Sequence, residues 1–389
     1  MLPDLPDDER FAFVRDGEGI VAWGVAERID VGTGPGRFDR AQQGLAQVAE
    51  ATGGDVVAFA SFTFDEDDPS VMVVPRTVVT RRDGVNRRST LGEPDDSDGP
   101  DEPAGPTTDP AADRPRYAGS TVRDDAWLEA VAQALVAIDA GELEKVVLAR
   151  DLHVWSRAPF DTVRLLVDLA ERFPSCMTFL VDHLLGASPE LLLRRDGPRI
   201  ASRVLAGTAA RGGDATEDAQ LGAALLASDK DRREHDLALT SAVAALESRC
   251  STLHVPDAPS LVRLDNVQHL GSDLEGMLDA DDLGDPGTHV LSLVGALHPT
   301  AAVGGAPRAE ALAAIARLEG MSRGRYAGPV GWCSASGDGE FAIALRCAEV
   351  RGDRARLFAG AGIVAGSLPE AELTETWLKL QAMTGVLGA

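Results

Sequence analysis

The order of apolar and polar positions predicts a chain in which helices and strands are mixed. Between 124 and 140, Trp127, Val131, Leu135 and Ile138 recur at helical spacing, whereas 145–154 (KVVLARDLHV) indicates a strand. Further helices are predicted at 162–172, 217–226, 228–249, 307–319 and from Ser367 onward. Further strands are predicted at 55–64, 71–80, 177–181, 190–195, 199–205, 329–332, 341–350 and 356–358, with a hairpin turn at Asp196-Gly197. The lack of a strict strand–helix–strand rhythm favours an α+β fold over a doubly wound sheet.

One segment breaks this pattern. Residues 92–115 contain six prolines, eight acidic residues and one arginine, and no Val, Ile, Leu, Met or aromatic residue. Such a stretch cannot bury enough apolar surface to offset the entropy lost on ordering. We therefore predict a disordered acidic segment, which is either a domain boundary or an insertion within one domain; as an insertion in the N-terminal part it would span about 83–116.

Composition narrows the function classes. The 389 residues carry a formal net charge of −25, which argues against nucleic acid or anionic membrane as the main partner. The chain shows no signal-peptide pattern, no spanning apolar run and no paired cysteine motif. A cytoplasmic protein is therefore expected.

Two predicted helices carry candidate metal ligands. Asp231 and Glu234 lie three residues apart on one, and Glu372 and Glu375 lie three residues apart on the last. If the two faces meet, they make an oxygen-rich site suited to Mg²⁺. The alternative is two ordinary solvated helix faces. Lys145, at the start of an apolar strand, is either an exposed strand end or a buried base.

Eight motifs together carry a family resemblance. They are LEKVVLAR (143–150), SPELLLRRDG (188–197), LAGTAARG (205–212), SDKDRREHDL (228–237), VQHLGSDLEG (267–276), LHPTAAVGGAPR (297–308), GPVGWCSASGDGEFAIALRC (328–347) and LFAGAGIVAGSLPEAELTETWLKL (357–380). In this order they resemble the chorismate-utilising enzymes, a family of isochorismate, salicylate, anthranilate and aminodeoxychorismate synthases. LHPTAAVGG is similar to the isochorismate synthase form of that segment.

The resemblance implies a fold and an activity. The fold would be a single chorismate-binding α+β domain over 1–389, an antiparallel β-sandwich flanked by helices. Residues 1–120 would be its divergent part and 121–389 its catalytic core. The activity would be Mg²⁺-dependent conversion of chorismate to isochorismate by a monomer, and both menaquinone and siderophore synthesis could use the product.

The resemblance also implies a role for each site residue. Lys145 matches the general base that activates water, and Glu190 matches the general acid that protonates the departing C4 hydroxyl. Glu234 and Glu375 would bind Mg²⁺, with Asp231 and Glu372 holding its coordinated waters. The substrate shell would comprise Thr208, His269, Ala296, Leu297, Arg346, Gly360, Gly362 and Lys379, among which His269 lies near the ring and Ala296 and Leu297 lie where relatives differ in nucleophile.

Three alternatives remain open from the sequence. Salicylate synthase would add loss of pyruvate to the same isomerisation. An anthranilate or aminodeoxychorismate synthase component would use ammonia, but no glutaminase motif is present. A non-catalytic chorismate-binding protein is disfavoured, because a binder needs no base–acid pair such as Lys145 and Glu190.

Overall fold

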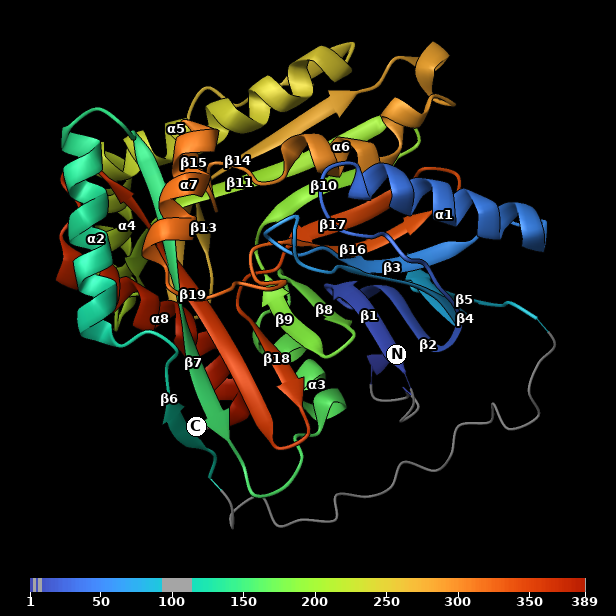
Figure 1. Cartoon of the computed structure of the whole chain (residues 1–389), viewed down its shortest axis with the longest axis horizontal. Coiled ribbons are helices and arrows are strands. Elements are labelled where there is room, and N and C mark those ends of the chain that lie inside the picture. The colour runs from blue at the N-terminus through green and yellow to red at the C-terminus, as the bar shows by residue number, and fades with distance from the viewer. Residues whose placement is uncertain (3–4, 6–8, 93–113, 389) are drawn as a thin grey trace.

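A computed structural model describes residues 1–2, 5, 9–92 and 114–388. All strands in these ranges belong to one antiparallel sheet that curls back on itself (Figure 1). Successive neighbours in this sheet are β7 (Lys145–Trp155), β19 (Arg354–Val364), β18 (Cys347–Arg351), β9 (Leu184–Ser188), β8 (Met177–Val181), β1 (Arg10–Arg15), β2 (Glu18–Arg28), β4 (Val71–Arg82), β3 (Val57–Ser61), β16 (Pro329–Ser334), β17 (Gly339–Ile343), β10 (Leu191–Asp196), β11 (Arg199–Ala210) and β14 (Val267–Met277). Shorter strands extend it: β5 (Val85–Thr90) on β4, β6 (Arg116–Gly119) and β15 (Gly305–Ala306) on β7, and β12 (Thr252–His254) and β13 (Ser260–Arg263) on β14.

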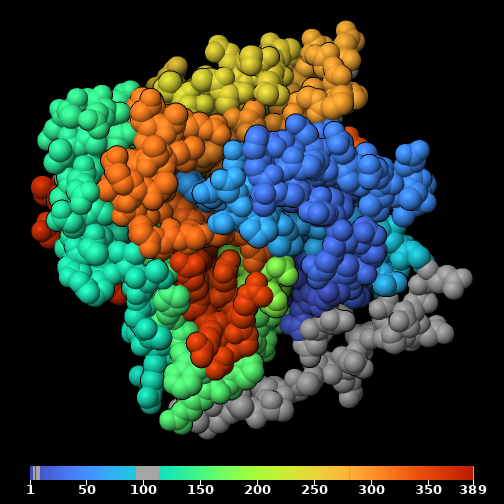
Figure 2. Space-filling view, viewed as in Figure 1, coloured from blue at the N-terminus to red at the C-terminus, as the bar shows by residue number. Residues whose placement is uncertain are grey.

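Helices cover the outside of this sheet. They are α1 (Arg37–Thr52), α2 (Asp124–Asp139), α3 (Thr162–Arg172), α4 (Ala215–Ala227), α5 (Asp229–Leu246), α6 (Val290–Leu297), α7 (Arg308–Leu318) and α8 (Pro369–Leu387). Helix α5 packs on β11, α8 on β19, and α2 and α7 on β7. Figure 2 shows the N-terminal residues, in blue, lying against the orange segment that contains α7. None of the helices in the described ranges is long and apolar enough to cross a membrane.

Both faces of the sheet are buried in a hydrophobic core. In β1, Phe11 and Phe13 belong to one apolar cluster, whereas Ala12 and Val14 belong to a second. This follows from the two-residue repeat of a strand, which points alternate side chains to opposite faces. The α+β class and the antiparallel architecture predicted from the sequence and its resemblance are confirmed.

An ion pair completes one edge of β7. Between β15 and β6, no strand of the described residues pairs with this edge at 147–149. There, Arg323 donates to the carbonyl oxygen of Val147 at 2.8 Å, and Glu319 accepts from the N–H of Ala149 at 2.8 Å. Arg323 and Glu319 are bonded to each other and are 4% and 3% exposed. Arg323 also donates to the carbonyl of Val303 at 2.8 Å, so one buried pair ties three segments together.

Three predicted boundaries need correction. The predicted strand 341–350 is two strands, β17 and β18, because the chain leaves β10 and β16 at Ile343 and turns to pair with β9. The last helix begins at Pro369 with Leu368 as its N-cap, not at Ser367. The predicted insertion at 83–116 is too wide, because 85–90 form β5 across a turn whose residues, Asp83 and Gly84, have φ of 52° and 72°. Residues 93–113 lie outside the described residues.

Candidate active site

A pocket opens where the two ends of the curled sheet approach each other. Its space, including the part open to solvent, is about 610 Å³, enough for a small ring compound. Strands β7 and β19 form one wall and β11 and β14 the other, with α5 and α8 contributing side chains. The pocket is lined by Val147, Pro189, Glu190, Leu205, Ala206, Gly207, Thr208, Glu234, His269, Ala302, Val303, Tyr326, Leu345, Arg346, Phe358, Ala359, Gly360, Gly362 and Lys379.

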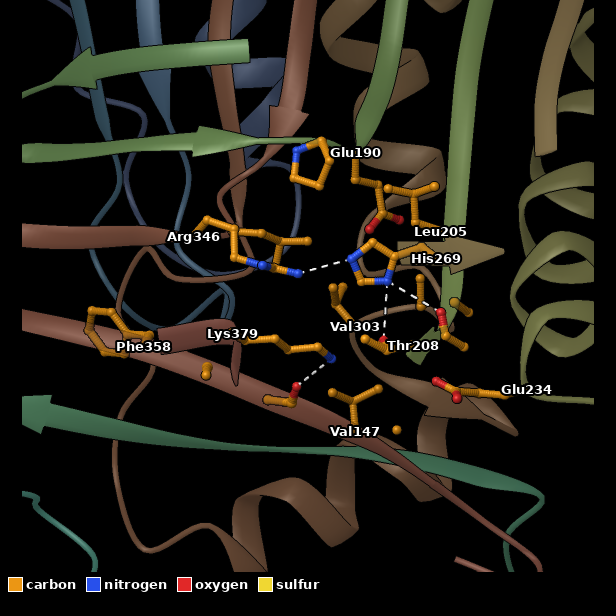
Figure 3. A pocket seen from close by; sticks show the side chains of 18 of the residues that line it. Val147, Glu190, Leu205, Thr208, Glu234, His269, Val303, Arg346, Phe358 and Lys379 are labelled. Carbon is orange, nitrogen blue, oxygen red and sulfur yellow. Dashed lines mark hydrogen bonds between the residues drawn. The ribbon is translucent and has the colours of Figure 1, made fainter. Parts of the chain in front are cut away.

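The pocket brings together most of the predicted substrate shell. Thr208, His269, Arg346, Gly360, Gly362 and Lys379 all line it, together with Glu190 and Glu234. Figure 3 shows Glu190, His269, Arg346 and Lys379 around one space. The two glycines are interior residues of β19. A Cβ at Gly362 would lie 2.1 Å from Glu234 Oε1, so this position requires the missing side chain.

Arg346 is aimed into the pocket by the break between β17 and β18. Its φ is +48°, an uncommon conformation for a residue with a side chain. Gly186 accommodates this turn, because a Cβ there would lie 2.7 Å from the carbonyl oxygen of Arg346. The Nη1 atom of Arg346 is buried and finds no hydrogen-bond partner within the described ranges. A buried, unpaired guanidinium donor in a pocket wall is suited to an anionic ligand group such as a carboxylate.

His269 holds the other end of this guanidinium. Arg346 Nη2 donates to His269 Nε2 at 2.9 Å, and His269 Nδ1 lies 3.2 Å from the carbonyl oxygen of Gly207 and 3.1 Å from Thr208 Oγ1. Burial, with Arg346 and Lys379, holds the pKa of His269 well below its usual value. The ring is therefore neutral, and this network assigns its proton to Nδ1. His269 therefore orients Arg346 by accepting its hydrogen bond.

Glu190 is a carboxylic acid at neutral pH. Burial raises its pKa to about 8, although Lys145 and Lys379 oppose the shift. Its backbone is fixed just before β10, where its carbonyl accepts from Ile343 at 3.1 Å and Ser188 Oγ lies 3.3 Å from its N–H. A proton donor is thus held in the pocket at a pH where an ordinary glutamate is ionised.

Three glutamates at the pocket each form an ion pair with a lysine. Lys145 Nζ lies 3.2 Å from Glu234 Oε1, and Lys379 Nζ donates to Glu375 at 2.6 Å and to the carbonyl of Gly360 at 2.9 Å. Lys230 Nζ donates to Glu372 at 2.7 Å. Burial tends to raise the pKa of Glu234. The positive charges of Lys145, Lys379 and Lys230 outweigh this effect, so the pKa of Glu234 is lowered. Lys145 is fully buried behind the wall, where its Cε lies close to Gly362.

The carboxylates form a compact acidic cluster. Burial, and then the charges of Glu234 and Glu375, raise the pKa of Asp231, and burial with Glu375 raises that of Glu372. The bond from Lys230 to Glu372 joins the helix of Asp231 and Glu234 to the helix of Glu372 and Glu375, and we call these four carboxylates the acidic cluster. Oxygen donors of this kind fit Mg²⁺, which needs only one or two carboxylates beside water and substrate oxygens. As the side chains of the described residues lie, no three of them converge as a metal site, because lysines occupy three of the carboxylates.

Two residues of the predicted substrate shell lie away from the pocket, and two aromatic lining residues were missed. Other predicted site residues also do not line it, namely Lys145, Asp231, Glu372 and Glu375. Ala296 and Leu297 end α6, where Leu297 is buried, and neither lines the pocket, so their role stays a prediction. Tyr326 and Phe358, which do line it, stack with ring centroids 5.1 Å apart. Neither carries a periodic signal. The signal that could have identified Tyr326 as a pocket residue is the family motif that begins two residues later, at Gly328. The place of Tyr326 in the pocket depends on stacking against Phe358 of β19, which is distant in sequence.

Comparisons with known proteins agree with this geometry. A family model described as "Chorismate binding enzyme" matches residues 100–388. The chain is 43% identical over 269 residues to isochorismate synthase DhbC of Bacillus subtilis and 41% identical over 263 residues to isochorismate synthase EntC of Escherichia coli, in each case covering 66% of both chains. These matches thus span about two thirds of the length of each relative.

Solved structures extend the likeness beyond the catalytic motifs. The structure of MenF, the menaquinone-specific isochorismate synthase of E. coli, matches 99% of this chain and 91% of that one, with a TM-score of 0.79 and 29% identity. Anthranilate synthase component I from Streptococcus pneumoniae shares the fold, with a TM-score of 0.71 at 19% identity over 98% of this chain and 93% of that one. The likeness to MenF therefore includes the N-terminal strands.

Proposed function

The chain belongs to the chorismate-binding enzyme family, and from that membership we propose that it is an isochorismate synthase. The reaction adds water at C2 of chorismate and expels the C4 hydroxyl. It needs a proton acceptor for the water and a proton donor for the leaving group. The similar proteins named as isochorismate synthases support this activity over the others of the family.

The observation that carries the proposal is the burial of Glu190 in the wall of a pocket that also holds Arg346 and Lys379. With a pKa raised to about 8 by burial, the Glu190 side chain keeps its proton at pH 7 and can give it to the departing hydroxyl oxygen. A hydroxide leaving group is poor, whereas water leaves readily.

Lys145 is the proposed proton acceptor for the attacking water. It starts the buried strand β7 and is held against Glu234 and Gly362. Its position behind Glu234 places it on the side of the pocket formed by β7, α5 and β19, while Glu190 comes from the start of β10. Lys145 at the start of β7 and Glu190 just before β10 thus come from different strands, and we assign them to the two sides of the ring.

The cationic residues of the pocket suit a dianionic substrate. Arg346 offers its unpaired Nη1, and Lys379 lies beside Gly360 within reach of the same space. Chorismate carries two carboxylates, so we assign one cation to each. In a chain whose net charge is −25, this local positive charge is what allows an anion to bind.

We also propose that the activity depends on Mg²⁺, held by Glu234 and Glu375 with Asp231 and Glu372 around them. When bound, the ion would neutralise a substrate carboxylate and fix its orientation. The compact acidic cluster and its oxygen donors support this assignment. The proposed setting is the cytoplasm, where free thiols such as the four unpaired cysteines persist, with the protein acting as a monomer.

Product analysis tests the proposal. Purified protein is incubated with chorismate and MgCl₂, and the products are separated by liquid chromatography. Isochorismate is the expected product. Salicylate with pyruvate would instead identify a salicylate synthase, and an amino product formed only with ammonium salts would identify an anthranilate or aminodeoxychorismate synthase. The absence of any product would refute all three.

A further inference from the structure

The lysines of this chain are confined to one place. The sequence has 37 Lys+Arg, of which only three are lysine: Lys145, Lys230 and Lys379. Each of the three pairs with a different glutamate of the acidic cluster, namely Glu234, Glu372 and Glu375. All ion pairs with basic partners elsewhere in the described ranges use arginine or histidine.

This distribution indicates that the cluster requires lysine. Where any cation serves, this chain uses arginine, with 34 of its 37 basic residues. Arginine binds carboxylates through a planar fork of two bonds, whereas lysine is a point charge on a flexible stem that is strongly hydrated and easily moved. Lys145 and Lys379 already have roles toward the substrate. Lys230 has none in the reaction, so its retention needs a separate explanation.

Lys230 lies on the solvent side of the cluster. It is the second residue of α5, one turn before Glu234, and its side chain is 30% exposed, whereas that of Glu372 is 3% exposed. Its Nζ forms an ion pair with the buried Glu372. It makes one hydrogen bond to Glu372. By contrast, Arg211 binds Asp218 through two parallel bonds, from Nε to Oδ1 and from Nη2 to Oδ2.

We propose that Lys230 is a displaceable counter-ion that competes with the divalent cation for the acidic cluster and so sets its affinity. In the metal-free protein its ammonium balances the charge of the buried Glu372. When the cation binds, the ammonium moves into solvent, toward which its stem is already open. This inference rests on the proposed Mg²⁺ dependence and adds a residue that tunes it.

The test compares metal affinity in two variants of opposite design. Metal-free full-length protein is titrated with MgCl₂ by calorimetry, without substrate, and thermal stabilisation by MgCl₂ is measured in parallel. Lys230→Met removes the competing charge and should bind Mg²⁺ about three- to tenfold tighter. Lys230→Arg replaces a single bond with a fork and should bind it more weakly. Arg232→Met, which removes an exposed charge from the same helix, should leave the affinity unchanged.

The outcomes separate this role from a structural one. If Lys230 only held Glu372 in place, Lys230→Met would bind Mg²⁺ more weakly, and that result overturns the proposal, as does equal affinity. Lack of Mg²⁺ binding by every variant also overturns it. The expected affinity pattern combined with no isochorismate from the unsubstituted protein would refute the proposed reaction while leaving this inference standing.

Discussion

Replacing Glu190 by glutamine should abolish the activity while making the protein more stable. Glutamine matches the shape of the protonated side chain but cannot give up a proton to the leaving hydroxyl. We expect turnover to fall by about 10²- to 10⁴-fold. The stability gain arises because the folded protein holds Glu190 as a neutral acid, with a pKa raised to about 8 by burial.

The magnitude and sign follow from proton linkage. An ordinary glutamate has a pKa of 4.5, so the unfolded chain releases this proton first and the folded state loses stability as pH rises from about 4.5 to about 8. Each pH unit in that window is worth about 1.4 kcal/mol. The Glu190→Gln variant does not lose stability in this way. Its free energy of unfolding should therefore exceed that of the unsubstituted protein by about 1.4 kcal/mol at pH 5.5, about 3 kcal/mol at pH 7 and about 4.5 kcal/mol at pH 8.5.

Urea unfolding without Mg²⁺, followed by tryptophan fluorescence, measures this difference at the three pH values. Glu142→Gln is the matched control, because Glu142 is exposed and should give the same free energy of unfolding as the unsubstituted protein throughout. An advantage that did not grow with pH would show that Glu190 is not held neutral. Normal turnover in the Glu190→Gln variant would show that Glu190 is not the general acid.

Further predictions concern the rest of the site. Lys145→Ala should lower turnover by about 10²- to 10⁴-fold while chorismate binding, measured by calorimetry, persists; normal turnover would exclude it as the base. Arg346→Lys should raise the chorismate KM about tenfold or more, because lysine cannot replace both the bond to His269 and the free donor, and an unchanged KM would contradict this. Gly362→Ala should weaken stabilisation by MgCl₂ in thermal unfolding, because its Cβ would displace Glu234, and undiminished stabilisation would argue against Glu234 as a ligand. Arg323→Met should cost about 3–5 kcal/mol in urea unfolding, since it strands the buried Glu319, and a loss below about 1 kcal/mol would refute that.

The sequence pattern was sufficient to predict those helices and strands whose own residues determine their structure. The strand that begins at Lys145 and the helix that carries Asp231 and Glu234 were both predicted, because an apolar run and a helical repeat are visible in the residues themselves. The hairpin between β10 and β11 was predicted for the same reason, but its turn residues are Gly197 and Pro198 instead of Asp196 and Gly197, because Asp196 pairs with Arg199; Gly197 has a positive φ of 58°. Helix α6 was missed, because its eight residues are almost all apolar and show no polar face.

Long-range pairing decided what the pattern could not show. Phe341–Val350 reads as one apolar strand, and only the pairing of β18 with β9 breaks it and turns Arg346 inward. The neutral state of Glu190 depends on burial by strands distant in sequence. Two of the three lysine–glutamate pairs depend on the meeting of α5 with β7 and with α8, which no single segment specifies, whereas Lys379 and Glu375 lie four residues apart on α8. The site roles themselves came from the family resemblance, and the structure supplied the charges and contacts.

The pocket closes a sheet that is otherwise open. Its walls, β7 with β19 and β11 with β14, stand near opposite ends of the strand order, so every strand between them must be in place before the pocket exists. A ligand that bridges these walls therefore binds only the complete fold, and its whole binding energy adds to the free energy of global unfolding. Because the bridged residues run from Val147 to Lys379 in sequence, the ligand acts as a non-covalent cross-link across most of the chain. Bound substrate thus protects even the remote N-terminal strands from proteolysis that requires global opening.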